Sequence, residues 1–299
     1  MTGTDGFTQD AVTADGVELA YLEAGRPGDP LVLCFHGFPD SPITWRHLAR
    51  DLAAADFRVV MPWLRGYPPS QVVHGPYQIA ALARDAIALA DALSPGRPAY
   101  LVGHDWGAHA AYGAAVLAPG RWAGMATLAV VPTRFFRPFL RRDADQQRAS
   151  WYQFLFQVEP LAEAIVSEDD FAFVDRLWAD WSPGWTADPA ALDAAKQSIR
   201  AGFPASLLYY RDTWQPARQD PALAADQQRI VEGTVAIPAL ALHGMRDGCI
   251  LPGAWEHAGG FYTGESVIDA LPGAGHFLHL ERPGLVNSKI VSFFTGHPG

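Results

Sequence analysis

The stretch LVGHDWGAH, residues 101–109, places a polar pentapeptide between an apolar run and a helix-forming run of small residues. No linker separates strand from helix, and such a tight turn strains the backbone of its central residue, Asp105. Glycines on both sides relieve the crowding, and the Asp105 side chain then projects above the carboxyl edge of the sheet. An aspartate that only caps a helix does not need both glycines. We therefore interpret Asp105 as a nucleophile.

Strand and helix signals alternate on both sides of this turn. Residues 17–25 alternate between apolar and polar side chains, as a half-buried strand does. Further strand signals occur at 30–37, 57–63, 99–105, 124–132, 235–244 and 266–273, and short continuous apolar runs among them are typical of strands buried on both faces. Helical periodicity occupies 44–55, 78–93, the run from 109 to the Pro119-Gly120 pair, and 284–294. This order predicts an α/β fold whose mostly parallel central sheet is flanked by helices.

One long segment breaks the alternation. Residues 133–232 are rich in aromatic and charged side chains and contain no continuous apolar strand run. We predict that this segment is an inserted, all-helical cap. The core domain would then comprise residues 1–132 and 233–299, with the cap formed by 133–232.

The composition excludes several classes of function. The chain has 299 residues and a net charge of −10, and its 22 Lys and Arg residues form no basic run, which disfavours nucleic acid and anionic membranes as partners. No run approaches the roughly 18 apolar residues of a membrane span, and the first residues lack the order of a signal peptide. We therefore expect a cytoplasmic protein. Cys34 and Cys249 lie in or beside apolar runs and are expected to be core residues.

Two further residues complete a catalytic set with Asp105. Asp247 lies in the loop after one predicted strand, and His276 lies in the loop after the next. The chain order is therefore nucleophile, acid, histidine, as in α/β-hydrolases. His279 is a rival to His276, but the glycine before His276 favours the latter. An acid hydrogen-bonded to one histidine nitrogen fixes the tautomer and stabilises the charged ring.

The loop His36-Gly37-Phe38-Pro39 follows another predicted strand. We expect its backbone to turn the N–H of Phe38 towards the elbow. The N–H of Trp106, directly after the nucleophile, would be the second donor of an oxyanion hole. We assign His36 a structural role, hydrogen-bonding the loops beneath the site.

Five motifs together resemble the α/β-hydrolase superfamily and, within it, the epoxide hydrolases, with haloalkane dehalogenases as close relatives. They are HGFP (36–39), RGYPPS (65–70), GHDWG (103–107), HGMRDG (243–248) and GAGHFLHLERP (273–283). The resemblance implies an α/β-hydrolase fold with a helical cap. It also assigns ring-opening roles to Tyr152, within 151–164, and to Tyr210 rather than Tyr209, within 203–214.

The chemistry explains why an aspartate replaces the serine of esterases. Opening an epoxide requires attack on a saturated carbon, and a carboxylate is already ionised at neutral pH. The leaving oxygen must receive a proton, which two phenols supply. The resulting ester on Asp105 would be hydrolysed by water that His276 and Asp247 activate. We expect a small apolar epoxide as substrate, water as co-substrate, and no metal or other cofactor. The sequence is compatible with a monomer or a homodimer.

Three alternatives compete with this hypothesis. A haloalkane or haloacid dehalogenase would use the same nucleophile, and Trp106 resembles the halide-binding tryptophan of the former. However, Phe38 stands where many haloalkane dehalogenases have asparagine, and GHDWG lacks the arginines of fluoroacetate dehalogenases. A non-catalytic ligand-binding protein would not need the complete set of acid, histidine and nucleophile. A serine esterase is disfavoured by Asp105 itself.

Overall fold

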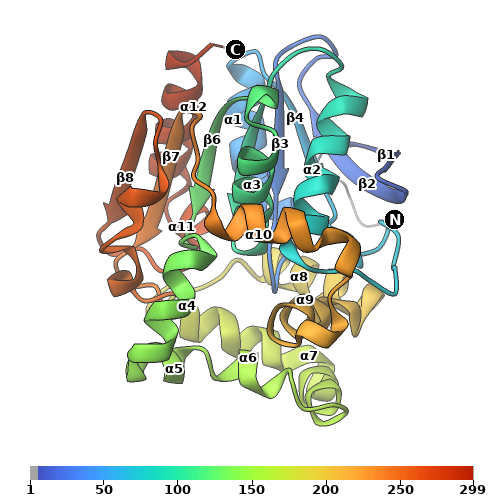
Figure 1. Ribbon diagram of the computed structural model, residues 1–299, viewed down its shortest axis with the longest axis vertical. Helices are drawn as coiled ribbons and strands as arrows, with labels where there is room; N and C mark the ends of the chain where they lie inside the picture. The colour runs from blue at the N-terminus through green and yellow to red at the C-terminus, as the bar shows by residue number, and fades with distance from the viewer. Residues whose placement is uncertain (1–5, 299) are drawn as a thin grey trace.

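An eight-stranded sheet forms the centre of the computed structural model, which describes residues 6–298 (Figure 1). In spatial order the strands are β1 (Thr8–Ala14), β2 (Val17–Ala24), β4 (Arg58–Pro62), β3 (Leu31–Phe35), β5 (Ala99–His104), β6 (Trp122–Leu128), β7 (Ala239–Gly244) and β8 (Ser266–Leu271). The β1–β2 and β2–β4 pairs are antiparallel, and all other pairs are parallel. The predicted α/β fold with a mostly parallel sheet is confirmed.

Helices bury both faces of the sheet. Leu31, Leu33 and Phe35 of β3 point to one face and pack with α2 (Ile79–Leu93) and α3 (Trp106–Leu117). Val32 and Cys34 point to the other face and pack with α1 (Arg46–Ala54) and α12 (Pro283–Gly296). Because side chains alternate along a strand, a strand buried on both faces is apolar throughout.

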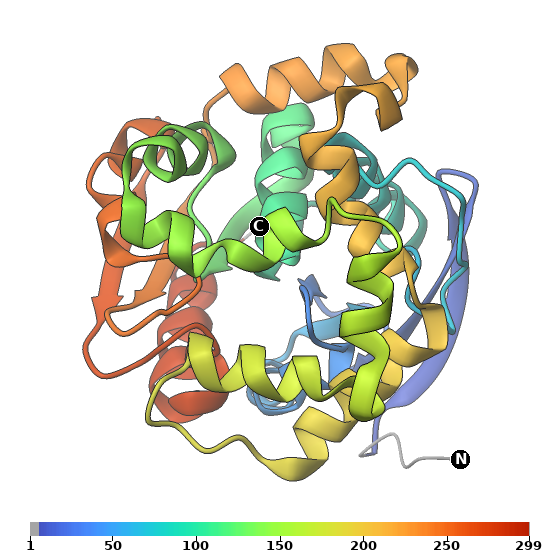
Figure 2. The same cartoon turned by 90° about the horizontal axis from the view of Figure 1, so that it is seen from below.

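Helices also fill the segment between β6 and β7. They are α4 (Thr133–Arg142), α5 (Ala144–Ala149), α6 (Trp151–Leu155), α7 (Leu161–Trp181), α8 (Pro189–Gly202), α9 (Ala205–Trp214) and α10 (Ala224–Glu232). Helices α4 to α9 lie beyond one end of the sheet, whereas α10 packs on α2 and α3 of the core (Figures 1 and 2). The helical content agrees with the sequence prediction. The division into core and cap domains stays our interpretation.

The remaining elements are short. Helix α11 (Leu278–Glu281) follows the His276 loop, and 3₁₀ turns occupy Pro42–Trp45, Pro119–Arg121, Pro216–Arg218, Pro221–Leu223, Pro252–Trp255 and Ala258–Phe261. Cys34 and Cys249 are free and buried, which confirms that they are core residues. Within residues 6–298, no helix is both long and apolar enough to span a membrane.

The sequence prediction missed β1 and misjudged several boundaries, including the end of β6 at Leu128 rather than residue 132. Strand β1 lies at the sheet edge with mostly exposed, polar residues, so it lacks an apolar run. The strand expected from 235 begins at Ala239, because Pro238 has no N–H to contribute to a ladder. The helix expected from 109 begins at Trp106, immediately after the turn.

The RGYPPS motif contributes a buried ion pair that ties the loop after β4 to α2. Arg65 Nε donates to Asp85 Oδ2 at 2.7 Å, and its Nη2 donates to Oδ1 at 2.5 Å. The two side chains are 4% and 5% exposed. A third donor, Arg65 Nη1, binds the carbonyl oxygen of Pro76 at 2.8 Å.

We expect Asp85→Ala to destabilise the protein strongly, because it leaves the Arg65 charge buried without a partner. Its free energy of unfolding should fall by about 3–5 kcal/mol. The matched control is Asp145→Ala, since Asp145 pairs with Arg148 on the surface and is 77% exposed. That change should cost less than about 1 kcal/mol. Urea titrations of both variants measure the difference, and equal losses would contradict the prediction.

Candidate active site

The turn between β5 and α3 holds Asp105 in a strained conformation. Its φ of 52° and ψ of −118° lie where non-glycine residues are rarely found. The surrounding glycines are required by close packing. A Cβ on Gly107 would lie 2.0 Å from the carbonyl oxygen of Phe35, and one on Gly103 would lie 2.2 Å from that of Gly107. The turn therefore presents Asp105 as the sequence predicts.

The structure brings Asp105, His276 and Asp247 together. His276 Nδ1–H donates to Asp247 Oδ2 at 2.9 Å, and His276 Nε2 lies 3.8 Å from Asp105 Oδ2. Backbone amides of Cys249 and Ile250 donate to the other Asp247 oxygen at 2.7 and 2.9 Å, which fixes that carboxylate. The three catalytic candidates are buried.

His279, the rival histidine, is not part of this arrangement. Its Nε2 hydrogen-bonds with the Thr44 hydroxyl at 2.5 Å, and its ring stacks on Trp45. The choice of His276 over His279 is therefore consistent with the geometry.

Attraction between His276 and the two carboxylates outweighs the effect of burial on the pKa values of His276 and Asp105. Burial alone would lower the pKa of His276, but Asp247 and Asp105 raise it to about 10. Burial alone would raise the pKa of Asp105, but His276, His104 and the Phe38 amide hold it below its usual value. The two groups therefore favour each other's charged form: the ionised carboxylate of Asp105 and the protonated ring of His276.

The loop after β3 approaches the same carboxylate. The Phe38 N–H donates to Asp105 Oδ1 at 2.7 Å. A side chain on Gly37 could not be accommodated, because its Cβ would lie 2.4 Å from Asp105 Oδ1 and 2.7 Å from the Trp106 amide nitrogen. The Phe38 amide thus contacts the Asp105 carboxylate, and the Trp106 amide nitrogen lies close to Gly37. The role of these two amides as oxyanion donors stays a prediction.

His36 and Pro39 hold this loop in place. His36 Nδ1–H donates to the Gly37 carbonyl at 2.9 Å, and Nε2 accepts from the Leu64 amide at 3.2 Å. Burial lowers the pKa of His36 to about 4, so the ring is neutral. The Pro39 carbonyl accepts from Trp178 Nε1 at 2.8 Å. His36, Gly37 and Pro39 shape the loop but are not among the residues that line the cavity beside Asp105.

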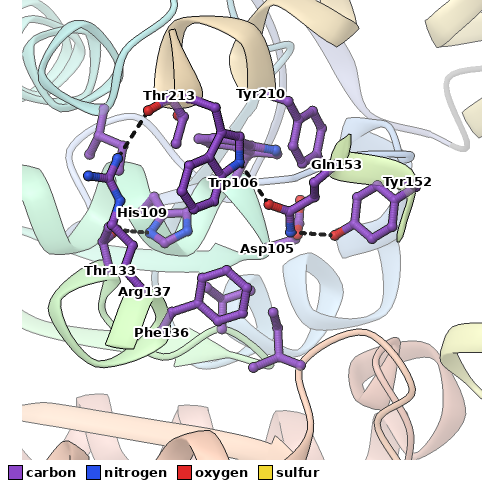
Figure 3. Close-up of a pocket in the computed structure, with 14 residues that line it drawn as sticks. Asp105, Trp106, His109, Thr133, Phe136, Arg137, Tyr152, Gln153, Tyr210 and Thr213 are labelled. Carbon is purple, nitrogen blue, oxygen red and sulfur yellow. Dashed lines mark hydrogen bonds between the residues drawn. The ribbon is translucent and has the colours of Figure 1, made fainter. Parts of the chain in front are cut away.

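Both predicted tyrosines line that cavity together with Asp105 and Trp106 (Figure 3). Tyr152 comes from α6 and Tyr210 from α9, and their ring centroids are 5.6 Å apart. The Tyr210 hydroxyl is buried without a hydrogen-bond partner in the part of the chain that the structure describes. By contrast, Tyr209 points away and donates to the Arg65 carbonyl at 2.6 Å. Tyr210, rather than Tyr209, is thus the residue that faces the cavity.

The two phenols are held in their protonated form. Burial, with the nearby Asp105 charge, raises the pKa of Tyr152 and of Tyr210 well above 10. A protonated phenol can donate a hydrogen bond to an oxygen placed above the Asp105 carboxylate.

Sequence reasoning missed Gln153, which orients Tyr152. The Gln153 amide Nε2 donates to the Tyr152 oxygen at 3.1 Å (Figure 3). The Gln153 Oε1 accepts from Trp214 Nε1 at 3.1 Å. Because the Tyr152 oxygen accepts this bond, its own proton is directed away from Gln153. Cys249 Sγ lies 3.4 Å from the Tyr152 hydroxyl. In the sequence, Gln153 is distinguished only by its position directly after Tyr152. Neighbours in the chain need not have side chains in contact, so the sequence did not predict this hydrogen bond.

A backbone carbonyl from α7 fixes two catalytic loops at once. The carbonyl of Trp181 accepts from the amide of Gly248 and from that of His276, each at 3.0 Å. His104 Nε2 supports the same loop from the opposite side, because it donates to the His276 carbonyl at 3.0 Å. No sequence pattern identifies a carbonyl acceptor of this kind.

Two groups of buried side chains lie close enough together to hold a metal ion. One contains Asp247, Cys249 and His276, which are already engaged in the hydrogen bonds above, and the other contains Asp40, His104 and His279. The chemistry that we expect of Asp105 needs neither of them, and the absence of a cofactor stays a prediction.

Comparison with known proteins places this site in a family. The model of the alpha/beta hydrolase fold matches residues 30–283. Epoxide hydrolase A of Mycobacterium tuberculosis is 28% identical, over 97% of this chain and 98% of that protein. An epoxide hydrolase of Caballeronia sordidicola is 31% identical, over 70% of this chain and 71% of that protein.

The backbone shows the same relationship. The crystal structure of epoxide hydrolase A from Mycobacterium thermoresistibile superposes with a TM-score of 0.79 at 28% identity, covering 98% of this chain and 99% of the other. The match therefore includes the helices between β6 and β7 as well as the sheet. The chain therefore belongs to the epoxide hydrolase family of the α/β-hydrolase fold.

Proposed function

We propose that this protein hydrolyses small epoxides with apolar substituents to vicinal diols, through a covalent ester on Asp105. The observation that carries the proposal is the pair of protonated phenols, Tyr152 and Tyr210, which face the same cavity as the ionised Asp105 carboxylate. A nucleophile for saturated carbon and proton donors for the departing oxygen are the two requirements of epoxide opening.

In the first half-reaction, an Asp105 oxygen attacks a ring carbon and the opposite C–O bond breaks. Tyr152 and Tyr210 hydrogen-bond the leaving oxygen, and one of them donates its proton, so that a hydroxyalkyl ester and a phenolate result. Trp106, Phe136 and Ile250 supply apolar lining for the substituents.

In the second half-reaction, water attacks the ester carbonyl. Ester formation has removed the Asp105 charge, one of the two that raise the pKa of His276, so this pKa falls. His276 loses its proton as the phenolate regains one, and the neutral ring then accepts a proton from the attacking water. The Phe38 and Trp106 amides stabilise the oxyanion. As the tetrahedral intermediate collapses, its ester C–O bond breaks and its hydroxyl proton passes to the departing alkoxide, which releases the diol and restores the Asp105 carboxylate.

One observation favours a dehalogenase as the second candidate. The Trp106 side chain lines the cavity beside the nucleophile, where an indole could contact a departing halide. A halide, however, leaves without a proton, so that reaction gives no role to two buried phenols.

A pair of assays with the purified protein tests the function. Styrene oxide should yield 1-phenylethane-1,2-diol, whereas 1-chlorobutane and fluoroacetate should release no halide. Halide release without diol formation would favour the dehalogenase instead. Failure with broad panels of both substrate classes would support a ligand-binding protein.

His276→Gln should stop the reaction at the ester, because the variant has no base for the second half-reaction. Incubation with styrene oxide should add one molecule of epoxide to the protein, detected by intact mass spectrometry and located on Asp105 by peptide mapping. The control is Asp105→Ala, which should form no adduct. An adduct on a different residue would overturn the assignment of the nucleophile.

Tyr210→Phe and Tyr209→Phe form a matched pair of neighbouring substitutions. Loss of the Tyr210 hydroxyl should lower kcat for epoxide hydrolysis by about 10²-fold, since a proton donor is lost. Loss of the Tyr209 hydroxyl removes its bond to the Arg65 carbonyl and should cost about 1 kcal/mol of stability with most activity retained. Equal kinetic effects of the two changes would refute the distinction.

A further inference from the structure

Helix α4 (Thr133–Arg142), beside the cavity, carries a concentrated positive charge. Its sequence TRFFRPFLRR contains four arginines and no acidic residue. None of the four forms an ion pair with any of the residues 6–298 that the structure describes. Such a helix contrasts with the chain as a whole, whose net charge is −10. It therefore offers a local attraction for anions.

Arg137 is the arginine of this helix that lines the cavity (Figure 3). Its Nη2 donates to the Thr213 carbonyl at 3.1 Å, and its guanidinium lies 5.2 Å from the centroid of the Trp214 ring. The Nε atom is buried and has no acceptor among the described residues. Because this Nε is covered by protein, an anionic ligand would meet the rest of the guanidinium, which lines the cavity and pairs with no carboxylate of the described residues. A cation in a partly buried position without a paired anion is costly, and an anionic ligand would relieve that cost.

The residues around Arg137 provide no anion. Asp105 is the one acidic residue that lines the cavity, and it is engaged by Phe38 and His276. His109 lines the cavity too, but burial and Arg137 lower its pKa to about 4 against the influence of Asp105, so it is neutral. Figure 3 shows Arg137 and Tyr152 on opposite sides of the group of lining residues. The unpaired cation thus lies away from the phenols that we assign to ring opening.

We infer that Arg137 forms a subsite for a carboxylate carried by the substrate, at the end of the cavity away from Tyr152. A guanidinium binds a carboxylate through parallel N–H bonds, and one cation matches a group with a single negative charge. Val130 and Phe136 line the cavity with Arg137 and suit an apolar spacer. The substrate class is then an epoxide with an apolar chain that ends in a carboxylate. This substrate class rests on the proposed function, whereas the anion subsite does not.

Equilibrium binding tests the subsite without any reaction. Calorimetry should compare octanoate with octanamide, neither of which carries an epoxide. The protein should bind octanoate about tenfold or more tighter, as expected for a hydrogen-bonded charge pair. Arg137→Met should remove this preference. Arg141→Met is the matched control, because it removes a charge from an exposed position on the same helix, and it should keep the preference. No preference for octanoate, or equal losses in both variants, would overturn the inference.

Turnover gives the second measurement. Diol release from 5,6-epoxyhexanoate and 7,8-epoxyoctanoate should be compared with that from the matching amides. At the better chain length, kcat/KM should favour the acid about tenfold or more, and Arg137→Met should lower the acid value more than the amide value. Arg137→Lys should retain part of the preference. A parallel loss for acid and amide would mean that Arg137 only ties α4 to Thr213. If octanoate binds through Arg137 but no epoxide is hydrolysed, the proposed function fails and the subsite stands.

Discussion

The backbone of Asp105 is the constraint on which the rest of the site depends. A positive φ at this residue turns β5 directly into α3 and directs the carboxylate to the Phe38 amide and His276. The strain is tolerated because Gly37, Gly103 and Gly107 let three backbone segments meet at distances that a Cβ would prohibit. Close packing therefore holds a conformation that the residue alone would avoid.

The position of Asp105 also couples its charge to the pKa of His276. His276 lies between two carboxylates, so its pKa depends on whether Asp105 is ionised or esterified. In the mechanism that we propose, the same residue stabilises the nucleophile as a cation before attack and acts as a base after the ester has formed.

The helical segment takes part in the catalytic geometry. Trp181, the last residue of α7, accepts hydrogen bonds from the loops of Asp247 and His276 through its carbonyl. Trp178 of the same helix binds the Pro39 carbonyl, and Tyr209 of α9 binds that of Arg65. These bonds join the inserted helices to the backbone of the core, so the position of the phenols is coupled to that of the carboxylate.

Local patterns of apolar residues and glycines predict seven of the eight strands, the tight turn at Asp105 and the order of acid and histidine along the chain. Resemblance to a family, rather than any local pattern, selected Tyr152 and Tyr210. The contact of Gln153 with the Tyr152 oxygen, and the position of Arg137 in the cavity wall without an ion pair to any described residue, became visible only in the folded structure. Strand β1 also emerged only there, because its polar residues pair through the backbone. Contacts between segments that are distant in the chain depend on how the segments pack and on where their side chains point. Local sequence patterns predict neither of these.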